Sequence, residues 1–190
     1  MKKLLVVVDY QKDFVDGALG FPKARTLETG ICEKISKYLE EGEKVLFTYD
    51  THYDNYLETR EGKNLPTVHC LDGSEGHELF GKLKEYKDNE NTLHYKKEAF
   101  ALSPKDIIFI KEELGENIDI IEFVGVVTNM CVISNVVAFQ GEYINSNLVV
   151  DASLCASFDD NLHEKALDVI ESLQVKVINR RWVKWQIHYC

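Results

Sequence analysis

Six short apolar runs, rich in β-branched residues, recur along the chain, and five of them precede a segment whose apolar residues repeat at helical spacing. Such runs are typical of buried strands, and the helical spacing is typical of amphipathic helices. The pattern predicts strands at residues 3–9, 43–48, 92–95, 118–125, 146–150 and 175–178. It predicts helices at residues 26–41, 74–87, 104–114, 129–141 and 159–172.

The alternation of strands and helices indicates the fold. A strand, a helix and a second strand in this order form a parallel pair with a right-handed crossover. We therefore expect one α/β domain over residues 1–190, with a doubly wound, Rossmann-like parallel sheet of about six strands and helices on both faces. Residues 49–73 have no periodic pattern and are long for a connection, which predicts a binding loop. Residues 179–190 mix two tryptophans with basic residues. We expect this C-terminal tail to pack on its own domain, with a contact to a neighbouring subunit as the alternative.

Composition narrows the class of protein. The chain has 190 residues, 45% of them hydrophobic, which is enough for one core without a second domain. A net charge of −10 argues against nucleic acid as the main partner, because a phosphate backbone is bound by a basic surface. No apolar run approaches the roughly 20 residues that span a bilayer, and the chain enters a core strand without a signal peptide, so we expect no membrane partner. The cysteines lack paired spacing, which predicts free thiols and a cytoplasmic location: Cys32, Cys70, Cys131, Cys155 and Cys190.

Cys131 lies where a predicted strand meets a predicted helix. The strand ends near Gly125, and Val132, Val136 and Phe139 repeat at helical spacing beyond the cysteine. Cys131 is therefore expected in the first turn of a helix, at the carboxyl edge of a parallel sheet. Free N–H groups and the positive end of the helix dipole favour a thiolate there, which predicts a lowered pKa and a nucleophile. The alternative is a small buried apolar residue without a chemical role.

Two charged residues follow other predicted strands. Asp9 comes after the first strand, at the edge where open α/β sheets bind their ligands. Lys97 comes just after residues 92–95. Taken singly, an aspartate at a strand end often caps a turn and a lysine is usually a solvated surface charge. Because both residues and Cys131 follow strands, they are expected to gather at one edge of the sheet.

Three motifs occur in order along the chain: Asp9-x-Gln11-x-Asp13-Phe14, Lys97-x-x-Phe100 and Gly125-x-x-Thr128-x-x-Cys131-Val132. With these motifs the chain resembles the isochorismatase-like cysteine hydrolase superfamily, whose best-known members are nicotinamidases, in register from about residue 3 to about residue 178. The resemblance implies a catalytic triad of Asp9, Lys97 and Cys131. At Asn129 the family usually has aspartate, and we expect an altered local hydrogen bond there rather than a lost mechanism.

These residue types indicate a covalent mechanism. A buried Asp9 with a raised pKa, its charge balanced by Lys97, can take the thiol proton at neutral pH. The thiolate then attacks an electrophilic carbon and forms a thioester, while Asp9 returns the proton to the leaving amine. The resemblance implies that the N–H groups of Cys131 and Val127 form the oxyanion hole, and that Val126 and Val127 are joined by a cis peptide bond.

A second group of residues has the types of a metal site. Asp50 and His52 follow the second predicted strand, and His69 stands 17 residues beyond His52. An aspartate and a histidine two residues apart can bind one ion, which a distant histidine completes with positions left open. In nicotinamidases the corresponding residues bind a divalent ion that holds the pyridine nitrogen of the substrate. The resemblance thus implies Asp50, His52 and His69 as ligands, with Glu61 or else Glu58 as an added carboxylate, and the ion as zinc, manganese or iron.

The residues expected around the substrate ring differ from those of nicotinamidases. Nicotinamidases commonly have an aromatic residue just before the last metal-binding histidine, where this chain has residues 65–68, Leu-Pro-Thr-Val. Phe14 and Phe100 are expected to form an apolar clamp in its place. The leading interpretation is a metal-dependent nicotinamidase that is a homo-oligomer with a small amide as its partner. The alternatives are a cysteine hydrolase acting on another small amide or on an enol ether such as isochorismate, and a non-catalytic binding protein.

Several other polar residues have no assigned role in this chemistry. Asp151, Ala152 and Ser153 follow the fifth predicted strand and are interpreted as structural support. The remaining histidines lack ligand spacing and are expected at the surface or packed in the core: His77, His94, His163 and His188.

Overall fold

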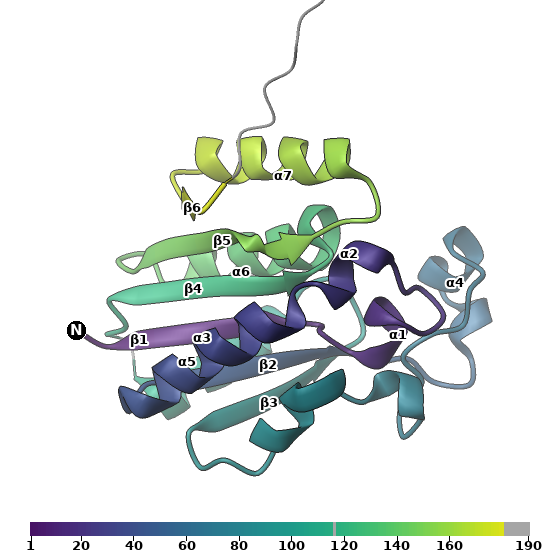
Figure 1. The fold of residues 1–190 in the computed structure, drawn as a ribbon, viewed down its shortest axis with the longest axis horizontal. Coiled ribbons are helices and arrows are strands. Elements are labelled where there is room, and N and C mark those ends of the chain that lie inside the picture. Colours follow the sequence, from purple (N-terminus) through teal and green to yellow (C-terminus); the bar gives the residue numbers. More distant parts are fainter. Residues whose placement is uncertain (116, 181–190) are drawn as a thin grey trace, which may run out of the picture.

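A computed structural model, which describes residues 1–115 and 117–180, contains one six-stranded sheet (Figure 1). All neighbouring strands are parallel, in the order β3-β2-β1-β4-β5-β6. This confirms the predicted doubly wound α/β fold in a single domain. The strands are β1 (Lys3–Val8), β2 (Lys44–Asp50), β3 (Thr92–Lys97), β4 (Ile120–Val126), β5 (Asn147–Ala156) and β6 (Lys176–Ile178).

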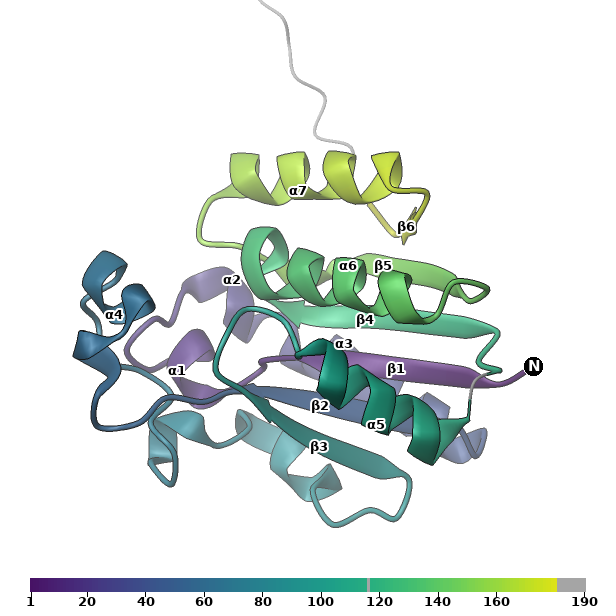
Figure 2. The same cartoon turned by 180° about the vertical axis from the view of Figure 1, so that it is seen from behind.

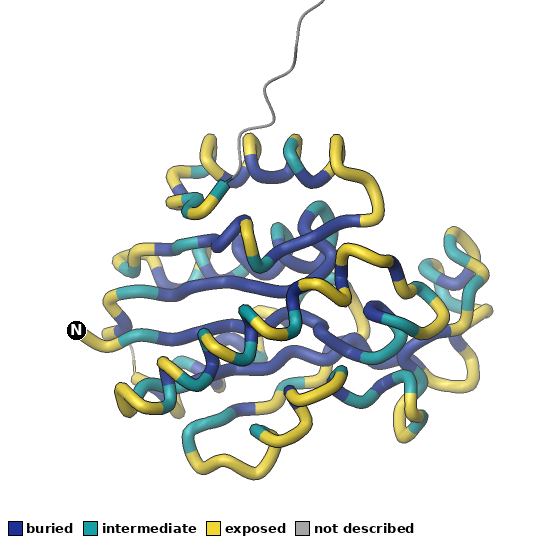
Figure 3. Tube along the Cα trace, viewed as in Figure 1, coloured by how far each residue is buried: buried dark blue, intermediate teal, exposed yellow. Residues whose placement is uncertain are grey.

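Helices cover both faces of the sheet (Figures 1 and 2). One face packs against α3 (Glu28–Glu40), and the other against α5 (Pro104–Leu114), α6 (Ile133–Glu142) and α7 (Asp160–Ser172). Successive residues of β1 alternate between these two cores, as the period of a strand requires. The central strands are buried along nearly their whole length, whereas the outer faces of the helices are exposed (Figure 3).

The prediction of a helix at residues 74–87 is wrong. This segment forms two 3₁₀ turns, Glu75–His77 and Gly81–Tyr86, separated by extended backbone. The extended part pairs with the chain after β1: Lys12 N–H donates to Glu78 O, and Phe80 N–H donates to Tyr10 O, both at 2.9 Å. A tertiary backbone contact therefore replaces the helix that the apolar spacing predicts. Three short helices were also not predicted: α1 (Lys12–Val15), α2 (Pro22–Arg25) and α4 (Arg60–Asn64).

The sheet order places the predicted functional residues at one edge. The chain winds from β1 to β2 and β3 on one side and continues through β4 to β6 on the other, so the carboxyl ends of β1 and β4 are neighbours. Such a switch point is where open α/β sheets bind ligands. Asp9 follows β1, while Asp50 and Lys97 are the last residues of β2 and β3. Gly125 has φ +115°, and a Cβ there would lie 2.1 Å from Val8 O, so only glycine fits where these two strands meet.

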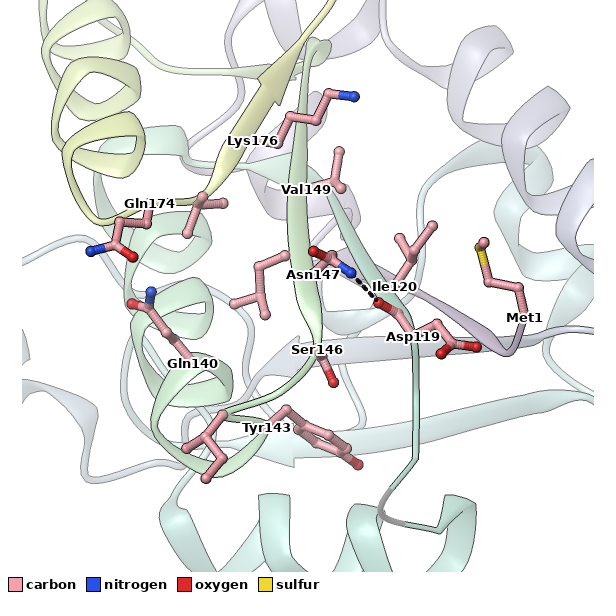
Figure 4. A pocket seen from close by; sticks show the side chains of 13 residues that line it. Met1, Asp119, Ile120, Gln140, Tyr143, Ser146, Asn147, Val149, Gln174 and Lys176 are labelled. Atoms are coloured by element: carbon pink, nitrogen blue, oxygen red, sulfur yellow. Dashed lines mark hydrogen bonds between the residues drawn. The ribbon is translucent and has the colours of Figure 1, made fainter.

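The opposite edge of the sheet has a separate hollow of about 510 Å³ (Figure 4). Asp119 and Asn147 line it, before β4 and at the start of β5, and Asn147 Nδ2 donates to Asp119 O at 3.2 Å. Met1, Gln174 and Lys176 form other parts of its wall. This hollow lies at the amino ends of the strands, away from the predicted site.

Two expectations from composition bear on the described residues. The four cysteines at positions 32, 70, 131 and 155 are free thiols, as predicted. Among the helices of residues 1–115 and 117–180, none combines the length and apolar character needed to cross a membrane. The fifth cysteine and the tail residues 181–190 lie outside the described part of the chain, so the predicted packing of the tail stays a prediction.

Candidate active site

Cys131 lies in a turn of π-helix, Thr128–Val132, that joins β4 to α6. It therefore stands just before the regular helix instead of in its first α-helical turn. A cis peptide bond joins Val126 to Val127, at the position that the family resemblance implies. The carbonyl oxygen of Val127 accepts two hydrogen bonds, from Met130 N–H at 3.0 Å and Val132 N–H at 3.2 Å. These two bonds hold the residues on either side of Cys131, and so fix the direction of its own backbone.

The structure brings Asp9, Lys97 and Cys131 together. Lys97 Nζ lies 2.7 Å from Asp9 Oδ2 and 3.9 Å from Cys131 Sγ. All three side chains are buried, and Asp9 is fully enclosed. The backbone of Asp9 is left-handed, with φ +46°, a conformation that residues other than glycine seldom adopt.

The electrostatics of this cluster correct one prediction. Burial, aided by Asp9 and Asp50, raises the pKa of Cys131 well above its ordinary value, and Lys97 only partly opposes this. The prediction that the start of a helix lowers this pKa is therefore wrong for the protein without a ligand, because desolvation outweighs the helix dipole. The resting group is a neutral thiol that needs a base. Burial also raises the pKa of Asp9 although Lys97 opposes it, which suits a carboxylate that must accept a proton.

Lys97 is the cation of the cluster. Burial lowers its pKa, but the charges of Asp9, Cys131 and Asp50 outweigh that effect and raise the pKa overall. Lys97 is thus an ammonium that balances buried carboxylates. Its second carboxylate is Asp50, whose Oδ1 is 3.3 Å from Lys97 Nζ.

Asp50, His52, Glu61 and His69 form a group suited to a metal ion. One ligand atom of each lies within 4.8 Å of those of all the others. Asp50 Oδ2 is 3.0 Å from His52 Nε2 and 3.3 Å from His69 Nε2. Glu61 Oε1 is 3.8 Å from His52 Nε2 and 3.9 Å from His69 Nε2. Ligands at about 2.1 Å from a tetrahedral ion stand about 3.4 Å apart, so these distances fit one ion. Glu58 is not part of this group in the described structure.

Neighbouring groups orient the two histidines. His69 Nδ1 lies 2.8 Å from the carbonyl oxygen of Thr67. A carbonyl can only accept, so Nδ1 donates and Nε2 is left with the lone pair that a metal needs. The ring of Tyr56 packs against both histidines, with centroid distances of 4.5 Å to His52 and 5.1 Å to His69. Tyr56 is itself held by a hydrogen bond from its hydroxyl to Leu65 O at 2.8 Å.

Two positioning residues connect the strand ends and were not identified as such from the sequence. Thr48 Oγ1 donates to Asp9 Oδ1 at 2.6 Å and accepts from Asp9 N–H at 3.2 Å. The Gln11 side chain accepts from Asp50 N–H at 2.8 Å and donates to Asp50 O at 2.9 Å. From the sequence alone, Gln11 belongs to a family motif but has no predicted role of its own. The signal for Thr48 was a hydroxyl inside an otherwise apolar strand.

The structure places the two residues of the predicted aromatic clamp against different cores of the sheet, and of the two Phe100 lines the hollow beside the metal-binding group, so the clamp stays a prediction. Phe14 packs in the core that contains α3, with its ring centroid 5.5 Å from that of His69. Phe100 packs against the opposite core and lines a hollow of about 190 Å³ beside His52 and Glu61. The hollow gives access to the metal-binding group from the loop that follows β2. Residues of the 49–73 segment thus contribute part of its wall, and the binding role of this segment stays a prediction.

The sequence also predicted an altered hydrogen bond at Asn129. In the structure Ser157 Oγ donates to Asn129 Oδ1 at 2.6 Å. Asp151 is buried and its carboxylate accepts from Lys34 Nζ at 2.6 Å and from Ser153 Oγ at 2.7 Å. This ion pair lies on the α3 side of the sheet, which agrees with a structural role for Asp151.

Residues 3–181 match the isochorismatase domain. The chain belongs to the isochorismatase family. A relative from Bacillus subtilis (strain 168), described as an uncharacterized isochorismatase family protein PncA, is 29% identical over 178 residues, which cover 88% of this chain and 93% of the relative.

Solved structures of the family have the same fold. The crystal structure of nicotinamidase/pyrazinamidase PncA from Bacillus subtilis superposes with a TM-score of 0.83 at 27% identity, covering 93% of this chain and 99% of that one. Pyrazinamidase of Pyrococcus horikoshii, solved in complex with zinc, has a TM-score of 0.80 at 24% identity and covers 94% of this chain and 99% of that one. The second likeness bears on the fold alone.

Proposed function

We propose that the protein is a metal-dependent nicotinamidase that converts nicotinamide and water to nicotinic acid and ammonia through a covalent thioester on Cys131. Its family and its relatives make it a hydrolase that acts on amide bonds. The observation that carries the proposal is that one residue, Asp50, contacts both Lys97 and the two histidines. A nucleophile cluster and a metal-binding group therefore share one small site, as an amide with a ligating ring nitrogen would require.

The first step is proton transfer from Cys131 to Asp9. The neutral thiol donates its proton to the Asp9 carboxylate, whose pKa burial raises toward that of a general base. Lys97, 2.7 Å from Asp9 and 3.9 Å from the sulfur, remains an ammonium and stabilises the new thiolate as it did the carboxylate. The thiolate adds to the amide carbon, and the C–N bond breaks as Asp9 returns the proton to the leaving nitrogen. Ammonia leaves and a thioester remains.

The second step is hydrolysis of the thioester. Asp9, again a carboxylate, takes a proton from water, whose oxygen adds to the acyl carbon. The carbon–sulfur bond then breaks, the acid is released, and Asp9 returns its proton to the Cys131 thiolate. Both tetrahedral intermediates have negative charge on oxygen. The N–H groups of Val127 and Cys131 are the donors that stabilise it in this proposal, since they belong to the rigid turn that carries the nucleophile.

The donor set at the neighbouring group fits a divalent ion. Two imidazole nitrogens and two carboxylate oxygens suit zinc, manganese and iron, and zinc is our first choice. Asp50, His52, His69 and Glu61 would hold the ion, and Lys97 would keep Asp50 in its charged form. Such an ion, when bound, supplies a Lewis acid that ligates the ring nitrogen and orients the substrate.

Phe14 and Phe100 are proposed to bind the two faces of the substrate ring. The aromatic residue that nicotinamidases commonly have before the last metal-binding histidine is missing here. The residue just before His69 is Val68, which is not aromatic and is 43% exposed. In this proposal Phe14 and Phe100 bind the ring instead. The missing aromatic residue also supports a second candidate, a hydrolase of the same mechanism that acts on another small amide. The predicted homo-oligomer and cytoplasmic location stay predictions.

The experiment that tests the proposal is ammonia release from a panel of small amides, before and after treatment with a chelator. We expect nicotinamide to be hydrolysed, and the activity to be lost with the metal and restored by adding zinc, manganese or iron. Hydrolysis of another amide without any hydrolysis of nicotinamide would establish the second candidate instead. Hydrolysis that survives complete metal removal would refute the metal dependence.

A further inference from the structure

The turn that carries Cys131 is tied to α7 by one buried hydrogen bond. Thr128 Oγ1 lies 2.8 Å from His163 Nδ1. Thr128 is fully buried and His163 is 6% exposed. A hydroxyl enclosed in this way would be left unsatisfied without the imidazole, at a cost of about 1–3 kcal/mol. The bond therefore constrains where the side chain of Thr128 can lie.

His163 is a firm anchor because the start of α7 is itself capped. The Asp159 side chain accepts from Asn161 N–H at 2.7 Å and from Leu162 N–H at 3.1 Å. His163 N–H donates to Asp159 O at 2.9 Å. A position in the first turn of a capped helix moves little, so the imidazole provides a fixed point against which the nucleophile turn is held.

The His163 imidazole constrains the proposed oxyanion donors, the N–H groups of Val127 and Cys131, through the peptide group that joins Val127 to Thr128. Thr128 shares the peptide group of Val127, whose carbonyl accepts from the N–H groups of Met130 and Val132. Rotation of that peptide would move both acceptor bonds, and with them the N–H of Cys131 that lies between. The N–H of Val127 belongs to the residue whose carbonyl is part of this peptide group, so it lies directly before it in the chain. Holding Thr128 therefore holds both proposed oxyanion donors.

We propose that His163, through its hydrogen bond to Thr128, is a positioning residue that orients the Val127 and Cys131 N–H groups toward the developing oxyanion. This inference rests on the proposed function, since it requires Cys131 to be the nucleophile. It assigns a role to a histidine that lacks ligand spacing in the sequence and lies on a helix outside the catalytic cluster. Oxyanion donors must be in place before the charge develops, so a small misdirection lowers the rate without altering substrate binding.

The test uses two reagents that react with the same thiol. The Cys131 thiolate adds to the carbonyl carbon of pyridine-3-carbaldehyde, and the product is a thiohemiacetal. The former carbonyl oxygen of the aldehyde then occupies the oxyanion position. Iodoacetamide alkylates the thiolate by displacement of iodide and develops no such charge on a carbonyl oxygen. Loss of the oxyanion donors should therefore weaken aldehyde binding and leave the rate of alkylation at Cys131, mapped by mass spectrometry, unchanged.

The variants separate the hydrogen bond from the fold. Thr128→Val keeps the shape of the side chain and loses the bond, and should weaken aldehyde binding and kcat by about 10–100-fold with KM within twofold of wild type. Thr128→Ser keeps the hydroxyl, and His163→Asn places an amide group where the imidazole Nδ1 lies. Both variants can therefore keep the hydrogen bond, and their kcat and aldehyde affinity should be within about threefold of wild type. His163→Ala combined with Thr128→Val should be no worse than Thr128→Val alone. Thr92→Val is the matched control, because it loses two hydrogen bonds at the far end of β3.

Three results would overturn the inference. The first is a folded Thr128→Val protein with wild-type aldehyde affinity and kcat. The second is a Thr128→Ser or His163→Asn protein as impaired as Thr128→Val, because the retained polar group should rescue it. The third is a parallel fall in the alkylation rate, which would assign the bond to the thiol or to the fold. A wild-type protein that neither alkylates at Cys131 nor binds the aldehyde would instead contradict the proposed nucleophile, and with it this inference.

Discussion

Asp50 Oδ1 lies 3.3 Å from Lys97 Nζ, while the other oxygen of the same carboxylate is 3.0 Å from His52 Nε2. Asp50 thus belongs to the nucleophile cluster and to the metal-binding group at once. Burial alone would raise its pKa, but Lys97 and the two histidines hold that pKa well below its usual range. These neighbours therefore favour the charged carboxylate of Asp50, which would offer a divalent ion an anionic ligand.

The first prediction concerns this shared carboxylate. Asp50→Asn keeps the volume but removes the charge, so affinity for the metal should fall at least about 10–100-fold and turnover should fall with it. Elemental analysis and ammonia release measure the two effects. Asp72→Asn is the control, since that carboxylate pairs with Lys96 at a more exposed position and should keep both metal and activity. Full metal content with wild-type turnover in Asp50→Asn would contradict the shared role.

The second prediction concerns the nucleophile. Cys131→Ala should lower turnover by at least about 10³-fold, because no other group can form the thioester. The protein should remain folded, with a loss of about 1 kcal/mol in unfolding free energy, since one buried sulfur is removed. Cys155→Ala is the control. It removes a similarly buried thiol, which lies in β5 outside the nucleophile cluster, and this variant should retain most activity. Thermal unfolding and kcat separate the two effects, and substantial activity in Cys131→Ala would exclude it as the nucleophile.

The sequence predicts the strands well because buried parallel strands are nearly continuous apolar runs. All six are found, although β5 continues to Ala156, beyond the predicted end at residue 150. Its pairing with β4 shifts register between Phe123 and Gly125, so the added residues form an irregularity that no apolar run could indicate. The error at residues 74–87 has a related cause, since pairing with the segment after β1 depends on the tertiary structure.

The candidate site divides in the same way. Asp9, Lys97 and Cys131 could be predicted because each belongs to a local motif at a strand end. Thr48 and His163 belong to no such motif, and their partners are 39 and 35 residues away in the chain, so the hydroxyl within β2 is the single local signal for Thr48 and none marks His163. The pKa of Cys131 was predicted in the wrong direction because sequence shows the start of a helix but not how completely the fold buries the thiol.

The third prediction is a pH dependence set by Asp9. Its carboxylate form must accept the thiol proton, so kcat/KM should fall as pH falls through the pKa of Asp9, which burial raises. The Thr48 hydroxyl stabilises the charged form and lowers this pKa, so Thr48→Val should move the acid limb to higher pH, by about one unit or more. Thr48→Ser keeps the hydroxyl and should leave the limb near its wild-type position. An unchanged or lower acid limb in Thr48→Val would show that Asp9 is not the group that titrates.

The fourth prediction compares nicotinamide with benzamide, which has the same shape but no ring nitrogen. In the proposed site both rings would lie between Phe14 and Phe100, so the apolar contacts would be shared. Only nicotinamide can ligate an ion held by Asp50, His52 and His69, and this contact would fix the amide carbon near Cys131. A site built for a ligating atom discriminates strongly against an analogue without it, so kcat/KM for benzamide should be lower by at least about 10²-fold.

The metal should account for that difference. Replacing His52 and His69 together by alanine should reduce nicotinamide turnover to the level of benzamide, while benzamide turnover changes little. Ammonia release with each amide, in the wild type and in this double variant, gives the four rates needed. Equal specificity constants for the two amides in the wild type would show that the site does not recognise the ring nitrogen. That result would contradict nicotinamide as the specific substrate, while the proposed role of the nucleophile cluster would still stand.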